Sequence, residues 1–206
     1  MKRILVIPFL VVSICLTSCD TVTEKSFDFK KYEHYREKVG SSYGTAKELL
    51  PPVDELGNYE TVQFAYKQVA YFFFQSEGIS LFLDYNEENY VLAKAYVEEN
   101  YTFIDDSDTV AKADYKYYQF PVASFEYKDY SFRIAPTPQV SESSEEPYYM
   151  CKSFVMIGYN EPLLSVAYLY FYDFDIDYLY CSDGSSGKVE DCMPKLIQDS
   201  FYWRKK

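Results

Sequence analysis

The chain has 206 residues and carries 32 Asp and Glu against 20 Lys and Arg, so its formal net charge is -12 at pH 7. Nucleic-acid binding needs clustered Lys and Arg that displace counterions from phosphate, so we expect no nucleic-acid partner for this acidic chain. The length suits one ordinary domain, which is large enough to bury a core without the help of metals or crosslinks.

The first twenty residues have the pattern of a secretory signal. Two basic residues precede an apolar run at 4–14, which falls short of the ~20 apolar residues that a membrane-spanning helix needs. Leu-Thr-Ser-Cys follows at 16–19, and this tetrad resembles the lipobox of bacterial lipoprotein precursors. The resemblance implies a signal peptide at 1–18 that is cut before a lipidated Cys19, and it carries no active site with it.

The lipobox resemblance also implies a location. Two acyl chains on Cys19 would hold the protein durably at a membrane, whereas one chain binds only marginally. We therefore expect a lipid-anchored protein on the extracytoplasmic face of the cell membrane, with the lipid bilayer as a partner through Cys19. Residues 19–26 would be an acylated tether, and residues 27–206 a single extracytoplasmic domain. The alternative is an ordinary signal peptide that contains Cys15 and Cys19.

The first element predicted in the domain is a short helix within residues 27–40. Tyr32, Tyr35 and Val39 recur at spacings of three and four, which is the period of a helix with one apolar face, and Gly40 provides a stop. The following segment is predicted to be mostly irregular, because its two adjacent prolines forbid a long helix.

A hairpin and a second helix are predicted next. Six apolar residues share one parity from 62 to 74, at positions 62, 64, 66, 70, 72 and 74, which indicates a long strand. A turn at Glu77 and Gly78 would then place Phe74 opposite Leu81. The helix follows over 87–101, with Asn86 as its N-cap.

The next stretch predicts a second hairpin, with its turn near Lys128 and Asp129. Residues 136–147 are rich in Pro, Ser and Glu, so we expect a mobile surface loop within the domain. A third hairpin follows, with its turn at Asn160 and Glu161.

A final helix is predicted near the C-terminus, with Pro194 in its first turn. About six strands in hairpin order and two or three helices together predict an α+β fold: one antiparallel sheet with the helices gathered on one face. The chain also has 24 tyrosines. Since tyrosine joins a large ring to a polar tip, we expect a tyrosine-rich strand core; the alternative is a stacking platform for sugar rings or a partner's side chains.

Three acidic residues form the weak candidate for a metal site: Asp173, Asp175 and Asp177. An EF-hand loop is ruled out, because it needs Gly and Glu where this chain has Tyr178 and Gly184. Three carboxylates at ~6.6 Å spacing on one strand face could still share a cation. We otherwise expect a solvated strand end, whose charges oppose aggregation at the sheet edge, and we assign no metal.

The sequence assigns no catalytic residue and no cofactor. His34 is the only histidine, which makes zinc sites and Ser-His-Asp catalysis improbable, and no phosphate or dinucleotide motif is present. We expect a non-catalytic binding or interaction module whose partner is an envelope protein or a cell-wall component. The alternative is a carboxylate-based enzyme acting on cell-wall glycan or peptide.

Three cysteines remain after the anchor: Cys151, Cys181 and Cys192. Cys181 and Cys192 flank a loop rich in Gly and Ser, and closing a loop of that size stabilises a fold by ~3 kcal/mol in the chain-entropy model. We predict a disulfide between these two. The predicted third hairpin places Cys151 opposite Tyr170, as a buried and free thiol.

Overall fold

The computed structural model describes residues 21–41, 44–71, 74–105, 120, 122–136, 153–173 and 192–205. The predicted signal peptide and Cys19 lie outside these residues. So do the rest of the predicted mobile loop after Pro136, and Cys151, Asp175, Asp177 and Cys181. Among the described helices, none is long and apolar enough to cross a membrane.

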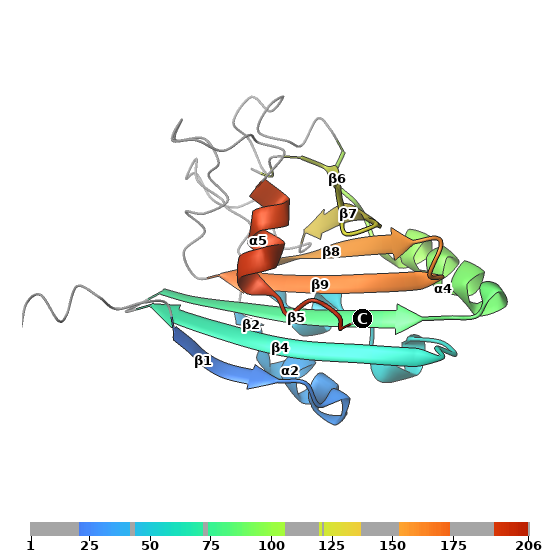
Figure 1. Cartoon of the computed structure of the whole chain (residues 1–206). Helices are drawn as coiled ribbons and strands as arrows, with labels where there is room; N and C mark the ends of the chain where they lie inside the picture. Colours follow the sequence, from blue (N-terminus) through green and yellow to red (C-terminus); the bar gives the residue numbers. More distant parts are fainter. Residues whose placement is uncertain are drawn as a thin grey trace, which may run out of the picture.

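Seven of the described strands form one sheet in which every neighbouring pair is antiparallel. Its order is β1-β4-β5-β9-β8-β7-β6 (Figure 1). The strands are β1 Thr21–Ser26, β4 Thr61–Tyr71, β5 Phe74–Asp84, β6 Ser124–Tyr127, β7 Tyr130–Pro136, β8 Ser153–Asn160 and β9 Ser165–Asp173. A two-stranded sheet joins β2 Gly40–Ser41 to β3 Gly44–Thr45. The predicted α+β class with an antiparallel sheet is confirmed.

The sheet has one strand more than predicted, because residues 21–26 do not form a free polar tether. They form β1, which pairs with β4 from Thr21 opposite Ala70 to Ser26 opposite Tyr66. Polar side chains suit an edge strand that keeps one side in water, so composition alone does not distinguish such a strand from a linker.

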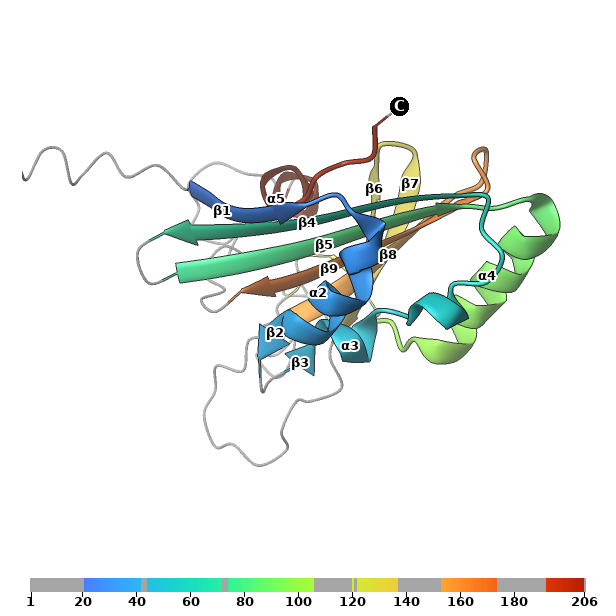
Figure 2. The ribbon, with the colours of Figure 1, turned by 90° about the horizontal axis from the view of Figure 1, so that it is seen from below.

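The helical elements lie on both faces of the sheet, so the prediction of helices on one face is wrong. They are η1 Phe29–Lys31, α2 Tyr32–Lys38, α3 Ala46–Leu49, η2 Val53–Glu55, α4 Glu87–Asn100 and α5 Cys192–Ser200. Figure 2 shows α2 and α3 on one side of the sheet and α5 on the other. All nine residues of β9 are buried, so the centre of the sheet has two apolar faces and each requires a cover.

Two predictions about helices are confirmed: the residue at which α4 begins and the apolar stripe of the first predicted helix. Asn86 caps α4, since its side chain accepts a hydrogen bond from the backbone N–H of Asn89. Tyr32, Tyr35 and Val39 are all buried, as the spacing in α2 predicted.

The register of the first hairpin differs from the prediction. β4 and β5 pair Phe64 with Leu81 and Lys67 with Gly78, so Gly78 lies inside a strand and the turn predicted at Glu77 and Gly78 is wrong. The glycine has another use: a Cβ on Gly78 would lie 2.5 Å from the carbonyl oxygen of Ser200. Close packing of the end of α5, and not a turn, requires the missing side chain.

The second hairpin turns at Lys128 and Asp129 as predicted. Both residues have positive φ, 49° and 68°, as the favoured two-residue hairpin turn requires.

The third hairpin is longer at its tip than predicted. Asn160 pairs with Ser165, so four residues turn where a turn at Asn160 and Glu161 was expected. The Asn160 side chain accepts a hydrogen bond from the N–H of Leu163 at 3.0 Å, and this local bond stabilises the wider turn. The register shifts, and Tyr170 lies opposite Val155 and not Cys151.

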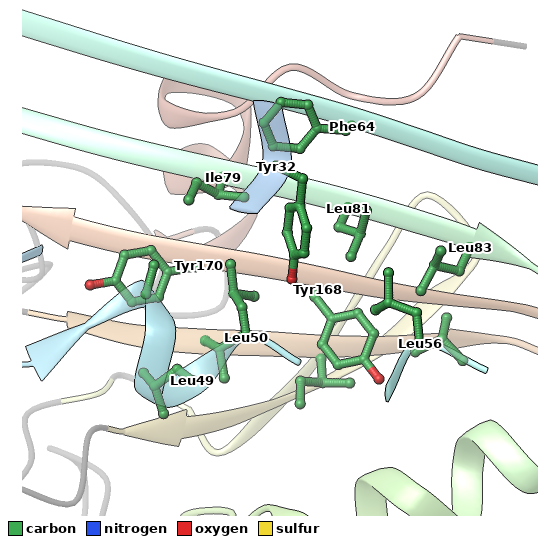
Figure 3. Packing of buried hydrophobic residues seen from close by; sticks show 14 of the residues in the cluster. Tyr32, Leu49, Leu50, Leu56, Phe64, Ile79, Leu81, Leu83, Tyr168 and Tyr170 are labelled. Carbon is green, nitrogen blue, oxygen red and sulfur yellow. The ribbon is translucent and has the colours of Figure 1, made fainter. Parts of the chain in front are cut away.

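Tyrosine is a core residue of this fold, as expected. Figure 3 shows the rings of Tyr32, Tyr168 and Tyr170 packed among aliphatic side chains on the α2 side of the sheet. The hydroxyls of buried rings reach backbone oxygens: Tyr32 donates to Pro51 at 2.6 Å and Tyr85 to Leu56 at 2.8 Å. These bonds offset the cost of burying a polar tip.

Candidate ligand-binding site

A pocket of about 220 Å³ lies where the C-terminal segment 201–205 crosses β4 and β5. Six aromatic residues and two basic residues contribute to its lining. The lining residues are Phe27, Phe29, Val62, Gln63, Phe64, Ala65, Ser80, Phe82, Tyr202, Trp203, Arg204 and Lys205.

Aromatic packing holds the C-terminal segment against the sheet. The Trp203 ring meets the rings of Phe82, Tyr127 and Tyr130 at centroid distances of 5.0, 4.9 and 5.6 Å, all near perpendicular. Edge-to-face contacts of this kind add to the stability gained from burial. Ser80 adds a directional contact, since its hydroxyl donates to the carbonyl oxygen of Tyr202 at 3.0 Å.

An ion pair at the end of the segment completes this attachment. Arg204 donates two hydrogen bonds to the Asp84 carboxylate, at 2.7 and 2.8 Å. The same guanidinium donates to the Tyr130 hydroxyl at 2.8 Å, and the Ser165 hydroxyl accepts from both, at 3.1 Å from Arg204 and 2.9 Å from Tyr130. Thr61 donates to the other side of Asp84 at 2.5 Å. The pair is thus oriented by three strands.

The network keeps both partners charged. Burial alone would raise the pKa of Asp84, but hydrogen bonds from Arg204 and Thr61 outweigh it, and the pKa is lowered. The hydrogen bond to Asp84 raises the pKa of Arg204, against the opposing effect of burial. Asp84 is therefore a fixed carboxylate near the pocket and an unsuitable proton donor at neutral pH.

The mouth of the pocket lies between the end of β1 and the C-terminal segment. The Phe27 ring is 55% exposed and lies 4.9 Å from the Tyr202 ring. The Gln63 side chain accepts from the backbone N–H of Lys205 at 3.0 Å, which places the exposed Lys205 ammonium 5.9 Å from the Phe27 ring.

This arrangement suits a ligand with an apolar body and a negative charge. The aromatic residues supply apolar surface, the Lys205 ammonium attracts an anion, and the lining itself contains no carboxylate, because Asp84 lies beside it in its pair with Arg204. Since Asp84 already pairs with Arg204, Lys205 is the cation at the mouth without an ion pair among the described residues.

The structure places few of the residues singled out in the sequence near this pocket. Asp173 ends β9 and is 5% exposed, so this carboxylate is buried and not part of a solvated strand end. No three His, Cys, Asp or Glu residues in the described part of the chain form a group that could hold a metal. His34 is exposed on α2, as expected.

Cys192 is the first residue of α5 and is disulfide-bonded. Its partner lies outside the described residues, so the pairing with Cys181 stays a prediction.

Sequence reasoning did not find the pocket, because its walls come from distant parts of the chain. Two weak signals point to it in retrospect. The first is that Phe27 and Phe29 occupy alternate positions directly after β1. The second is the aromatic run at 201–203, which basic residues follow.

In comparisons with known proteins, no family model, no curated protein and no solved structure matched this chain.

Proposed function

We propose that this chain is a membrane-tethered extracytoplasmic binding module whose ligand occupies the aromatic pocket. The observation that carries the proposal is the lining itself: six aromatic and two basic residues border a concave space, and Phe27 is more than half exposed at its mouth. Exposed aromatic side chains beside a cavity are typical of recognition sites, since their rings bury much area on binding at a low cost in conformational entropy.

The pocket is a better candidate than the faces of the sheet. Tyr66, Tyr168 and Tyr170 project from the sheet but are buried beneath the helices. The stacking platform considered from composition therefore has no counterpart among these three strand tyrosines. The tether part of the proposal rests on the lipobox resemblance at Cys19.

The only tryptophan of the chain, Trp203, lines the pocket, so 5-fluorotryptophan gives one ¹⁹F resonance that reports on it. We would titrate the purified full chain with 2-naphthoate, which combines an apolar double ring with a carboxylate. We expect saturable movement of the resonance with a Kd on the order of 1 mM, as ligand efficiency allows for a compound of this size. The cationic analogue 2-naphthylmethylamine should bind more weakly.

The control compares two exposed apolar side chains. Phe27→Ala should weaken 2-naphthoate binding about threefold to tenfold, the range expected for one aromatic contact. Val91→Ala, at a 62% exposed position on α4 outside the lining, should leave it unchanged. A resonance that does not move, or equal affinities for wild type and Phe27→Ala, would refute the assignment of the site.

A further inference from the structure

Among the strands that the structure describes, part of β4 has a neighbour on one side only. β1 reaches only as far as Ser26 opposite Tyr66. The chain then leaves the sheet, because Asp28 caps η1 by accepting a hydrogen bond from the N–H of Lys30. Among the described strands, residues 61–65 of β4 therefore pair with β5 alone.

The pocket opens onto this edge of the strand. Residues 62–65 all line it, although neighbouring side chains of a strand point to opposite faces. Phe64 belongs to the core on the α2 side, while the partners of Gln63 and Ala65 are Phe82 and Ser80, next to the C-terminal segment. Phe29 and Val62 pack against the same core as Phe64, whereas Phe82 and Trp203 belong to the core on the other face, and all of them line the pocket. The pocket therefore extends around the edge of β4.

We propose, building on the function proposed above, that the natural ligand is an extended acidic segment of a partner protein that pairs with residues 61–65 of β4. Addition of a strand to an open sheet edge provides main-chain hydrogen bonds for affinity, and pockets for alternate side chains provide specificity. Here Phe27 and Tyr202 flank the edge on one side, and Phe29 packs against Tyr59, just before β4.

Charge decides which strand fits. Asp84 neutralises Arg204, so the positive charges here that have no ion pair among the described residues are Lys205 in the lining and the exposed Lys30 and Lys31, which directly follow Phe29. These three lysines outnumber the two exposed carboxylates beside the edge, Asp28 and Glu60, in a chain of net charge -12. A second copy pairing through the same edge would bring these like charges together, whereas acidic residues alternating with apolar ones would oppose them favourably.

The test uses a fluorescein-labelled eight-residue peptide that alternates Asp with Val, with one central Phe, and follows its anisotropy with the full chain. Two N-methylated versions of the peptide are compared, and each carries methyl groups on one of the two alternating sets of backbone amides. In a paired strand only one set faces β4, so methylating that set should weaken binding at least about tenfold and methylating the other set less than about threefold. Replacing Asp with Lys in the peptide should also weaken binding at least about tenfold.

Two measurements on the protein side complete the design. Hydrogen exchange of backbone amides within 61–65 should slow about tenfold or more when the peptide binds. Lys205→Glu should weaken binding of the acidic peptide several-fold. Lys47→Glu, at an exposed site on α3, should leave this binding unchanged.

The outcomes separate this inference from the proposed function. If 2-naphthoate moves the Trp203 resonance but both methylated peptides bind alike, or exchange within 61–65 is unchanged, strand addition is refuted and the pocket assignment stands. The chain could instead form a dimer whose amides within 61–65 lose their protection from hydrogen exchange on dilution. That result would show that a second copy occupies the edge, and it would refute the acidic partner. If neither naphthoate nor peptide binds, both proposals fail.

Discussion

Asp84 and Arg204 lie 120 positions apart in the chain and are joined by two parallel hydrogen bonds, at 2.7 and 2.8 Å. Asp84 ends β5, and Arg204 follows α5. Their side chains are only 21% and 16% exposed, so removing one partner leaves a largely desolvated charge. This pair attaches the C-terminal wall of the pocket to the sheet.

Asp84→Asn should destabilise the fold by about 2 kcal/mol, less than the loss of a fully buried pair because both groups retain some contact with water. Urea unfolding followed by Trp203 fluorescence at pH 7 measures this. Lys47→Glu, which removes only an exposed pair with Glu37 at 3.7 Å, is the matched control and should change stability by less than about 1 kcal/mol. Equal effects of the two changes would contradict the role given to Asp84.

The Asp84 contribution should depend on pH with a definite sign. Its pKa is lowered in the folded chain, so its stabilisation is fully present above the unfolded value of about 3.9 and is lost as the pH falls toward the lower folded value. The difference in unfolding free energy between wild type and Asp84→Asn should therefore shrink below about pH 4. A difference that grows on acidification would mean that the carboxylate is not the stabilised form.

Gly78→Ala should destabilise the fold by about 2 kcal/mol, because the new Cβ would lie 2.5 Å from a backbone oxygen of Ser200 and α5 must shift. Gly57→Ala is the comparison: its φ of 72° makes an alanine strained, but no atom lies within 4 Å of the added Cβ. Its cost should be about 1 kcal/mol. Thermal unfolding of both variants checks which of them loses more stability. A Gly78→Ala variant as stable as the wild type would contradict the close contact between β5 and α5.

Cys19→Ala should release the protein from the membrane fraction, since the lipobox resemblance places the lipid on that thiol. Cys15→Ala should leave the distribution unchanged. Fractionation of cells that express each variant decides between them. Retention of Cys19→Ala in the membrane would refute the lipid anchor and with it the tethered part of the proposed function.

Peptide mapping without reduction should find Cys192 linked to Cys181. Closing a loop of that size is worth ~3 kcal/mol in the chain-entropy model, so Cys181→Ser should lower the unfolding free energy by a similar amount. Cys151→Ser should cost less, because that thiol is predicted to be free. A linked peptide that contains Cys151 would overturn the pairing.

Local signals in the sequence predicted the α+β class, the turn at Lys128 and Asp129, the Asn86 cap and the buried stripe of α2. Each depends on residues within one or two turns of each other, so period, cap and turn chemistry suffice. Only the tertiary structure decided the register of β4 and β5, the strand formed by residues 21–26 and the division of the helices between two faces. Gly78 illustrates the reason: its neighbours suggest a turn, but contact with Ser200, far along the chain, makes it a strand residue. The pocket likewise arises only when Phe27, β4 and Trp203 meet, because no local pattern encodes contacts made between distant segments.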